Sequence, residues 1–330
     1  MVSLPCLVLT AGLGTRLRPL TSVRAKPAMP VAGEPLVRRI LRWLAASGVA
    51  RAVLNLHHRP ETICAVVGDG SDLGLHVRYS WEQPILGSAG GPRRALPLVA
   101  ADRFLIVNGD TLTDLDLGRL ANEHEGSGAL VTLAVIPNRR PDRYGGVLVD
   151  DAGTVTGFIG RGSARPSWHY IGVQAVESRA FERLRDGEPA ETIGSLYPAL
   201  IRERPGSVRA LTCDASFVDI GTPADYLATS LALAGDGGRL AGERCVVPGS
   251  ASVVRSVLWD DVSVGDGASL VECVVADGVR IPAGARWTRR AIIRAEGRVA
   301  ADGEEVVGDL LAAAIERTLG APARGGPQPS

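Results

Sequence analysis

The chain has 330 residues, of which 45% are hydrophobic and only 4% aromatic, so a sizeable core must be built mainly from aliphatic side chains. Its 36 basic and 36 acidic residues give zero net charge, which argues against nucleic acid or an anionic membrane as partner. The five cysteines are scattered and never spaced as C-x-x-C, which argues against disulfides and zinc and favours a cytoplasmic location. The first ten residues lack a basic flank, so they are expected to form a buried strand and not a signal peptide.

The first 135 residues alternate between short apolar runs and amphipathic stretches. Strands are expected at 4–10, 52–56, 76–80, 103–107 and 129–135, and helices at about 35–47, 60–67, 92–98 and 115–124. A glycine-rich turn is expected at 87–91. This alternation predicts an α/β fold with a largely parallel sheet.

The pattern changes after residue 136. Short strands are expected at 146–149, 154–158, 168–176 and 208–212, and helices at about 178–186 and 192–203. A last helix should begin at Pro223, because Thr222 is a good N-cap and proline suits the first helical position. We therefore assign residues 1–236 to one domain.

A polar, glycine-rich linker at 235–243 leads to a second kind of repeat. Leu258, Val264 and Leu270 lie six residues apart, and glycines punctuate the stretch. A period of six is typical of left-handed β-helix coils, so residues 244–296 are expected to form a short β-helix-like segment. Residues 297–330 are expected to contain an amphipathic helix at 304–319 and a disordered Pro/Gly/Ser-rich tail at 321–330.

The most informative local signal is the glycine loop after the first strand, AGLGTRLRP from Ala11 to Pro19. Small residues at a strand end let backbone N–H groups approach phosphate oxygens, although a structural turn uses the same residues. The loop fits neither G-x-G-x-x-G nor G-x-x-x-x-G-K-[ST]. Nearby Lys26 is the only lysine in the chain, beside 35 arginines (36 minus 1), which favours a position that requires a compact ammonium over chance survival.

With Lys26-Pro27 and the later segments VNGD (107–110), YGG (144–146) and FVDIGTP (217–223), this loop closely resembles the signature of the nucleoside-diphosphate-sugar pyrophosphorylases. The motifs occur in family order over about residues 1–230. The resemblance implies a Rossmann-like mixed sheet with helices on both faces. It also implies an enzyme that joins a nucleoside triphosphate to a sugar 1-phosphate and releases pyrophosphate with Mg²⁺.

The resemblance assigns roles to individual residues. Asp110 lies just past a predicted strand, where a turn-forming aspartate is also common; by resemblance it is a catalytic Mg²⁺ ligand, and Asp219 is the second. Arg16 and Lys26 are the expected catalytic cations. The residues expected at the nucleotide are Ala11, Gly12, Leu13, Gly14, Thr15, Gln83, Gly87, Ser88 and Gly109, although Gln83 is equally suited to a solvated strand end.

The sugar side departs from the family pattern. Gly145 and Gly146 match the sugar-binding turn, but the common Phe-x-Glu-Lys is here Phe158-Ile159-Gly160-Arg161. The family's Asn before a glycine is missing from the next strand, where Tyr170 and Gly172 stand. We expect Gly145, Gly146, Arg161, Tyr170 and Gly172 to bind the sugar phosphate.

The Gly-Ser-Ala-Gly loop and the short β-helix favour GTP and mannose 1-phosphate as substrates. The alternatives are uridylyl, thymidylyl or cytidylyl transfer to another sugar or alcohol phosphate. A catalytically silent regulatory or scaffold subunit of the same fold is the alternative of another class. The exposed edges of a short β-helix predict a homo-oligomer.

Overall fold

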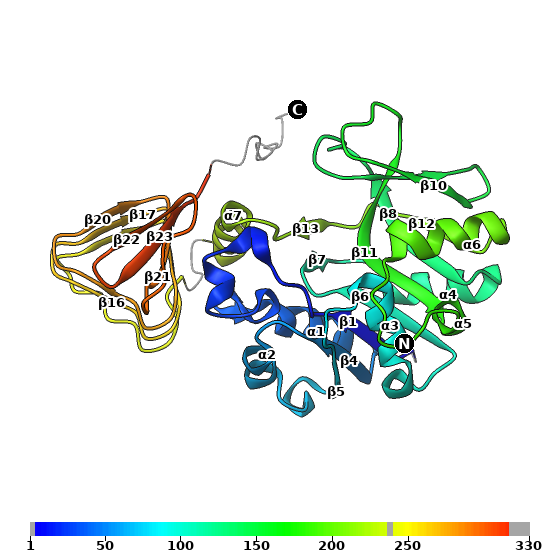
Figure 1. The fold of residues 1–330 in the computed structure, drawn as a ribbon, viewed down its shortest axis with the longest axis horizontal. Helices are drawn as coiled ribbons and strands as arrows, with labels where there is room; N and C mark the ends of the chain where they lie inside the picture. Colours follow the sequence, from blue (N-terminus) through cyan, green and yellow to red (C-terminus); the bar gives the residue numbers. More distant parts are fainter. Residues whose placement is uncertain (1–3, 236–239, 317–330) are drawn as a thin grey trace, which may run out of the picture. The chain divides into compact units, whose positions relative to one another are not determined.

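The computed structural model describes residues 4–235 and 240–316 (Figure 1). The predicted disordered tail at 321–330 lies outside these residues. Contacts divide the chain into two compact units. The larger unit comprises Met1–Leu13, Arg24–Met29 and Glu34–Asp219, and the smaller unit comprises Gly14–Val23, Pro30–Gly33 and Ile220–Ser330. No helix within the described ranges is long and apolar enough to cross a membrane.

The larger unit is built on a nine-stranded sheet with the path β10-β9-β11-β6-β1-β4-β5, and β8 joins β11 to β12 beside it. The strand bounds are β1 Cys6–Leu9, β4 Arg51–Leu56, β5 His76–Trp81, β6 Arg103–Asn108, β8 Val131–Pro137, β9 Gly146–Val149, β10 Val155–Ile159, β11 Trp168–Glu177 and β12 Val208–Thr212. Strands β6, β1, β4 and β5 are parallel, whereas β11 runs antiparallel to β6, β8 and β9. The expected mixed sheet is thus confirmed.

The strand order places a topological switch point between β1 and β6. From β1 the chain moves outward through β4 and β5, and β6 then returns to the opposite side of β1. In open α/β sheets, ligands bind outside the carboxyl ends of the strands at such a point. The carboxyl ends of β1 and β6 are Leu9 and Asn108, so this edge is where a ligand site is expected.

Helices flank the sheet. Helix α3 packs against β1, β4 and β5, and α4 packs against β8 and β11. The helices of this unit are α1 Leu36–Ala46, α2 Pro60–Val67, α3 Gly87–Val99, α4 Leu117–Ser127, α5 Arg179–Glu182 and α6 Tyr197–Glu203. A π-helical turn at Thr192–Leu196 directly precedes α6. The turn expected at 87–91 is instead the start of α3. A side chain at Gly90 would meet the Glu188 carbonyl oxygen at 2.6 Å, so glycine here serves close packing within a helix.

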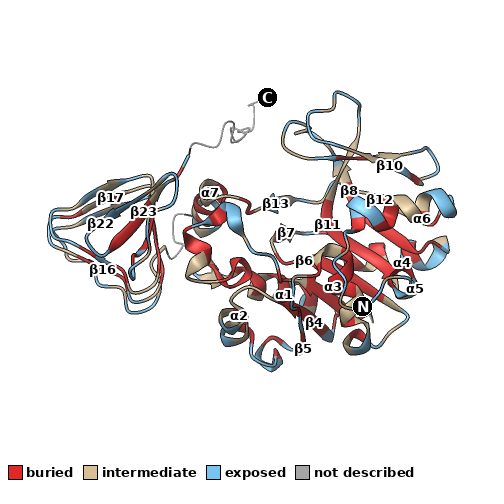
Figure 2. Cartoon of the chain, in the orientation of Figure 1, coloured by how far each residue is buried: buried red, intermediate tan, exposed pale blue. Residues whose placement is uncertain are grey.

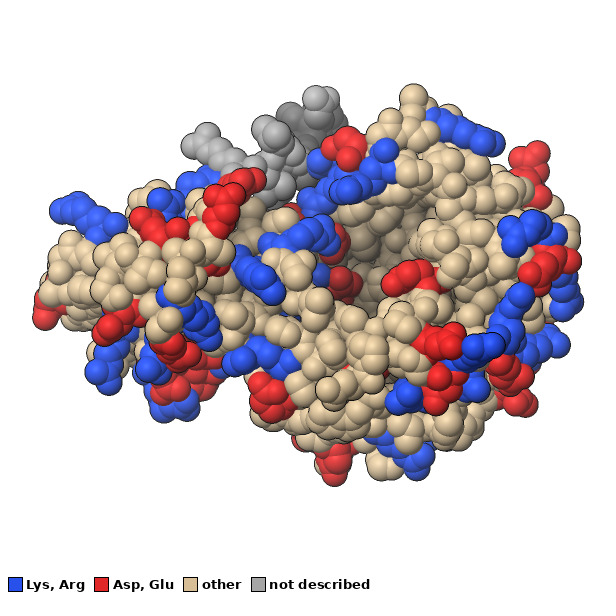
Figure 3. Space-filling view, viewed as in Figure 1, with Lys and Arg blue, Asp and Glu red and all other residues tan. Residues whose placement is uncertain are grey.

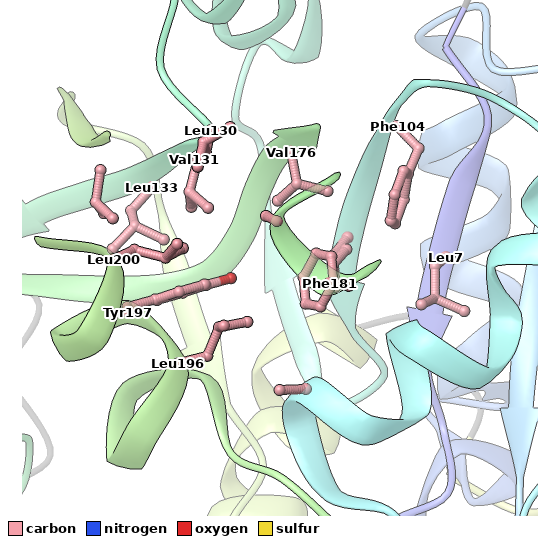
Figure 4. Close-up of a cluster of buried hydrophobic side chains, with 14 of the residues drawn as sticks. Leu7, Phe104, Leu130, Val131, Leu133, Val176, Phe181, Leu196, Tyr197 and Leu200 are labelled. Atoms are coloured by element: carbon pink, nitrogen blue, oxygen red, sulfur yellow. The ribbon is translucent and has the colours of Figure 1, made fainter. Parts of the chain in front are cut away.

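The core of the larger unit lies between the sheet and these helices. Phe104 of β6 and Phe181 of α5 approach each other with ring centroids 6.1 Å apart, and Tyr197 lies in the same cluster (Figure 4). Most other members are Leu, Val and Ala, as the low aromatic content predicts. The sheet strands are accordingly the main buried elements of this unit in Figure 2. Acidic and basic side chains are interspersed over the face shown in Figure 3.

The smaller unit contains α7, Pro223–Ala234, and a β-helix. As expected, the Thr222 side chain caps α7 by accepting from the Asp225 N–H. The coil strands stack in parallel rows: β14 Ser252–Val254, β17 Ser269–Val271 and β20 Arg286–Thr288; β15 Val257–Leu258, β18 Val274–Val275 and β21 Arg290–Arg294; β16 Ser263–Val264 and β19 Arg280–Ile281. The predicted six-residue period is present in the buried Leu258, Val264 and Leu270. Each full coil nevertheless takes 17 residues, since Ser252 pairs with Ser269 and Ser269 with Arg286.

The prediction of a helix at 304–319 is wrong for residues 304–316, which are the part that the structure describes. Residues Glu304–Val307 and Leu310–Ala314 form strands β22 and β23, and β23 pairs antiparallel with β21. Gly308 lies between them at φ 59°, a left-handed conformation that interrupts a helix. The free edge of β21 offers backbone hydrogen bonds to β23, and this pairing buries Leu310 and Leu311.

Candidate active site

The carboxyl ends of β1 and β6 are joined by close backbone contacts. The Gly109 N–H donates to the Leu9 carbonyl at 2.9 Å. A Cβ at position 109 would lie only 2.6 Å from that same oxygen, so no other residue fits here without a shift. On the other side, the Thr10 N–H donates to Asn55 Oδ1 at 2.6 Å. These bonds fix the start of the glycine loop and the turn that carries Asp110.

Lys26 and Asp110 meet at this edge. Lys26 Nζ lies 2.6 Å from Asp110 Oδ2, and Lys26 is only 9% exposed. The lysine starts a short 3-10 helix, Lys26–Ala28, whose preceding Ala25 N–H donates to Thr62 Oγ1. The only ammonium side chain of the sequence is therefore held against the carboxylate that the motif singled out.

The second predicted carboxylate reaches the same edge through a two-stranded pairing. Strand β13, Phe217–Asp219, runs antiparallel to β7, Thr111–Thr113, and sets Asp219 opposite Thr111. Opposite residues in such a pair have Cα atoms about 5 Å apart. Asp219 thus lies beside the residue that follows Asp110, although 109 positions separate the two aspartates (219 minus 110). Its Oδ2 lies 3.7 Å from an Arg143 guanidinium nitrogen.

This pair of carboxylates suits a metal ion that takes few protein ligands. No group of three or more His, Cys, Asp or Glu side chains forms a metal cluster among residues 4–235 and 240–316. Mg²⁺ commonly uses only one or two carboxylates, with water and phosphate oxygens as its other ligands. Both aspartates contact a cationic side chain in this structure, so each already has a counter-charge. Two neighbouring carboxylates are donors of the kind that Mg²⁺ takes.

The glycine loop offers a row of backbone donors. The N–H groups of residues 11–16 donate no hydrogen bond to any described part of the protein. Gly12, Leu13, Thr15 and Arg16 are exposed, and a Cβ at Gly12 would meet nothing within 4 Å. Consecutive free amides of this kind bind anions readily. Ala11, Gly12 and Leu13 belong to the larger unit, whereas Gly14, Thr15 and Arg16 belong to the smaller one.

A buried carboxylate organises the loop before α3. Glu82 is 4% exposed, accepts from Asn55 Nδ2 at 2.6 Å, and accepts from the Leu86 N–H at 2.8 Å. Asn55 in turn accepts from Thr10, so one hydrogen-bonded chain connects the end of β1 with the 83–88 loop. Gln83 itself is exposed. Its exposure is compatible with a nucleotide contact and with a solvated strand end alike.

A cavity of about 400 Å³ lies next to the start of α3. Ser88 Oγ is 2.5 Å from Glu191 Oε2 and accepts from the Thr192 N–H at 2.9 Å. Gly87 adopts φ 74°, and a Cβ there would lie 2.8 Å from the Ala190 carbonyl oxygen, so its backbone conformation and its packing both favour glycine. The lining residues are Leu9, Ser88, Asn108, Tyr170, Gln174, Glu191, Thr192, Ile193 and Gly194. Three of them come from the π-helical turn, a local geometry that is frequent at functional sites.

Tyr170 is the predicted sugar residue that this cavity includes. Burial raises the pKa of Tyr170 above its usual range, and the Asp110 carboxylate adds to the rise. Gly172, at φ 79°, makes room for Asn108, whose side chain a Cβ there would touch at 2.7 Å. Arg161 is exposed and is not among the lining residues, so the structure does not bring it to this cavity.

The turn at Gly145 and Gly146 packs against the protein itself. A Cβ at Gly146 would overlap Ser167, and one at Gly145 would lie 3.1 Å from the Ile159 carbonyl oxygen. The ring centroids of the neighbouring Tyr144 and His169 lie 4.2 Å apart, and those of His169 and Phe217 of β13 lie 4.7 Å apart. Burial lowers the pKa of His169 to about 4, despite a hydrogen bond with the Gly145 backbone that raises it, so the ring is neutral at pH 7. This aromatic cluster connects the glycine turn to the strand that carries Asp219.

Several residues of this site escaped the sequence reasoning: Asn55, Glu82, Gln174, Glu191 and Thr192. Asn108 stood there as part of the VNGD motif, without a role of its own. Asn55 and Gln174 had a usable signal, because each is a polar residue between apolar neighbours in a buried stretch of strand. A buried polar group needs a hydrogen-bonding partner, and such positions often mark a network. Glu191 had no comparable signal in its local sequence.

Comparison with known proteins identifies the chain. Residues 6–235 match the nucleotidyl transferase family, and residues 239–312 match the GlmU-like C-terminal hexapeptide family. The chain belongs to the nucleotidyl transferase family. A mannose-1-phosphate guanylyltransferase from Mycobacterium tuberculosis is 31% identical over 290 residues, covering 84% of this chain and 81% of the relative. A UTP–glucose-1-phosphate uridylyltransferase from Synechocystis is 29% identical over 67% of this chain and 61% of the relative.

Solved structures share the fold of this nucleotidyltransferase. HddC from Yersinia pseudotuberculosis superposes with a TM-score of 0.61 at 23% identity, over 69% of this chain and 98% of that one. A putative glucose-1-phosphate thymidylyltransferase from Bacillus anthracis gives 0.62 at 18% identity, over 71% and 96%. Together with the family match, these relatives make the protein a sugar-1-phosphate nucleotidyltransferase, an enzyme whose substrates are a nucleotide and a sugar phosphate.

Proposed function

We propose that this nucleotidyltransferase transfers a guanylyl group from GTP to mannose 1-phosphate in the cytoplasm. The observation that carries the proposal is the Lys26–Asp110 pair at the β1/β6 switch point, because it sets a cation and a metal-type carboxylate where a triphosphate would lie. The choice of GTP follows the Gly-Ser-Ala-Gly loop at Gly87. It is supported by the Mycobacterium tuberculosis relative, whose similarity extends over most of the chain.

In the proposed reaction, a phosphate oxygen of the sugar 1-phosphate attacks the α-phosphorus in line, and the bond to the departing pyrophosphate breaks. A phosphate monoester is already nucleophilic near pH 7, so positioning and charge neutralisation are the main tasks of the protein. The Gly12–Thr15 amides and Arg16 stabilise the negative charge of the pyrophosphate. Lys26 offsets charge near the α-phosphate.

Family members generally use a divalent metal, and we propose Mg²⁺ for this chain. Asp110 and Asp219 would hold the ion, which would offset negative charge on the phosphate oxygens when bound. Gly109 keeps the Asp110 turn close to β1, whereas Ala11 continues β1 into the loop.

The sugar phosphate is assigned to the cavity beside Tyr170. Gly145, Gly146 and Gly172 are the proposed backbone contacts of the sugar phosphate, and of these Gly172 lies against Asn108, which lines the cavity. Gln83, Gly87 and Ser88 are the proposed contacts of the nucleotide, and Ser88 also lines this cavity. Arg161 stays a predicted phosphate contact that would have to move to reach this cavity. Glu191 and Asn108 are among the polar residues that line this cavity, and we assign them to the sugar hydroxyls.

A pyrophosphate-release screen of GTP, UTP, dTTP and CTP against a panel of sugar 1-phosphates tests the proposal. GTP with mannose 1-phosphate should give the highest kcat/KM. A higher value for another pair would replace the substrate assignment but keep the reaction class. No release with any pair would favour a silent regulatory or scaffold subunit.

A further inference from the structure

A second cavity lies wholly within the smaller unit, at the end of the β-helix. Its volume is about 610 Å³, within the range of about 300–1,000 Å³ typical of small-molecule sites. It is bordered by β19, by the turn after β21, and by the hairpin between β22 and β23. None of the residues assigned above to nucleotidyl transfer lines it.

Three arginines face two carboxylates around this cavity. Arg280, Arg294 and Arg298 line it together with Glu296 and Asp309. Arg294 and Arg298 share the single Glu296 carboxylate, at 3.8 Å and 3.4 Å. The Arg280 side chain has no ion-pair or hydrogen-bond partner among the described residues, whereas its backbone pairs with Ser263. The lining therefore carries an excess of positive charge.

This arrangement differs from the rest of the β-helix. Elsewhere in the β-helix, an arginine pairs with a carboxylate on the neighbouring coil, 17 positions away in the sequence. The bidentate Arg244–Asp261 pair is an example. The residue 17 positions after Arg280 is Gly297, which has no side chain to offer. Arg280 belongs to a different row, in which it stacks on Ser263 of the preceding coil, so neither neighbouring coil offers its guanidinium a carboxylate.

The remaining lining suits a phosphate with an organic part. Gly297 and Gly308 both line the cavity, and their N–H groups donate to nothing within the described chain. Arg298 is oriented by a 2.9 Å hydrogen bond from its Nη1 to the Arg294 carbonyl. Val306 and Leu310 add an apolar wall. Guanidinium groups bind phosphate through paired N–H donors, and free glycine amides supplement them.

We propose that this cavity is a binding site for a phosphate-bearing small molecule, separate from the site of nucleotidyl transfer. Its ligand carries one or two phosphate groups on the arginines and a small organic group against Val306 and Leu310. The proposal does not depend on which substrates the enzyme uses, because no residue is shared between the two sites.

The test follows assigned glycine amide signals of the full-length chain, labelled with ¹⁵N-glycine, during titration with inorganic pyrophosphate and separately with GMP at constant ionic strength. Gly278, Gly297 and Gly308 report on the β-helix cavity, whereas Gly12 and Gly109 report on the catalytic edge. We expect both groups of signals to shift. In Arg280→Glu, the apparent Kd from the cavity signals should rise at least tenfold, while the catalytic signals and basal pyrophosphate release stay unchanged.

Arg286→Glu is the matched control, since Arg286 is exposed on β20 of the same β-helix and does not line the cavity. It should leave every titration as in the wild type. Tighter binding of GMP than of pyrophosphate to the cavity would support the organic group of the ligand, and the reverse would overturn that part of the proposal. The proposal would be overturned if the amide signals of Gly278, Gly297 and Gly308 did not shift with either probe. It would also be overturned if they shifted equally in Arg280→Glu. Either result would count whatever the catalytic signals show.

Discussion

Lys26 Nζ and Asp110 Oδ2 lie 2.6 Å apart, although 84 positions separate the two residues in the chain. The contact arises because Asp110 ends the turn after β6, next to β1, while the glycine loop after β1 leads the chain to Lys26. At the switch point, an ammonium suits the offsetting of phosphate charge and a carboxylate suits the holding of a metal ion.

Asp110→Asn should lower turnover at least about a hundredfold at saturating substrates, because a metal held by this carboxylate supplies several kcal/mol of transition-state stabilisation. Asp219→Asn should act in the same direction. Asp151→Asn, at an exposed turn, is the control. Pyrophosphate release is the measurement, and a near wild-type rate for Asp110→Asn would remove it from the metal site.

Glu82→Gln should weaken the loop before α3. Glutamine can accept only one of the two hydrogen bonds, from Asn55 and Leu86, through its carbonyl oxygen, so a buried donor loses its partner. The expected cost is about 1–3 kcal/mol of unfolding free energy, with a raised KM for nucleotide. Urea unfolding and substrate titration measure the two effects. Glu61→Gln, on the exposed face of α2, should change neither, and an unaltered KM in Glu82→Gln would limit Glu82 to stability.

His169 predicts a pH dependence of stability. Its folded-state pKa of about 4 lies below the usual value near 6.5, so between these values the unfolded chain binds a proton that the folded chain does not. Stability should therefore fall as pH drops from about 6.5 to 4. His124, whose pKa burial also lowers to about 4, acts in the same direction. His169→Phe should show a shallower fall in urea midpoint, and an identical fall would contradict this cause.

The β-helix predicts self-association. Val246 is 62% exposed and Val254 45% exposed on coils too few to cover their own surface. Light scattering should give a homo-oligomer for the full chain and a smaller assembly after deletion of residues 244–330. Circular dichroism checks that the shortened chain folds. A monomeric full-length chain would be the contrary result.

Local patterns predicted most of the elements because their signals are local. The Thr222-Pro223 start of α7 and the apolar run of β6 depend only on neighbouring residues, and both occur as expected. Strand β23 escaped prediction because one of its partners, β21, lies outside the segment, at Arg290–Arg294, and its other partner, β22, lies across a two-residue turn. Gly308-Asp309 is a turn signal that a helical interpretation overlooks.

The candidate site divides in the same way. Asp110 and Lys26 carry motif signals, and the structure brings them together. Glu82 and Glu191 become recognisable only through their distant partners, Asn55 and Ser88, which the fold places beside them. Arg161 was predicted by analogy with a missing lysine, and it lies outside the cavity that contains Tyr170.

The most direct test of the account is pyrophosphate release by Lys26→Arg at saturating GTP and mannose 1-phosphate, with circular dichroism to confirm folding. Lys26 is 9% exposed and in contact with Asp110, so a planar guanidinium has little room to replace the ammonium. Loss of a charge-assisted contact to a transferring phosphoryl group costs about 2–4 kcal/mol, or roughly 30- to 1,000-fold in rate. We predict a loss in that range for Lys26→Arg and at least as large a loss for Lys26→Ala. Full activity in the arginine variant would show that any cation suffices, and full activity in the alanine variant would contradict the assignment of Lys26 to the active site.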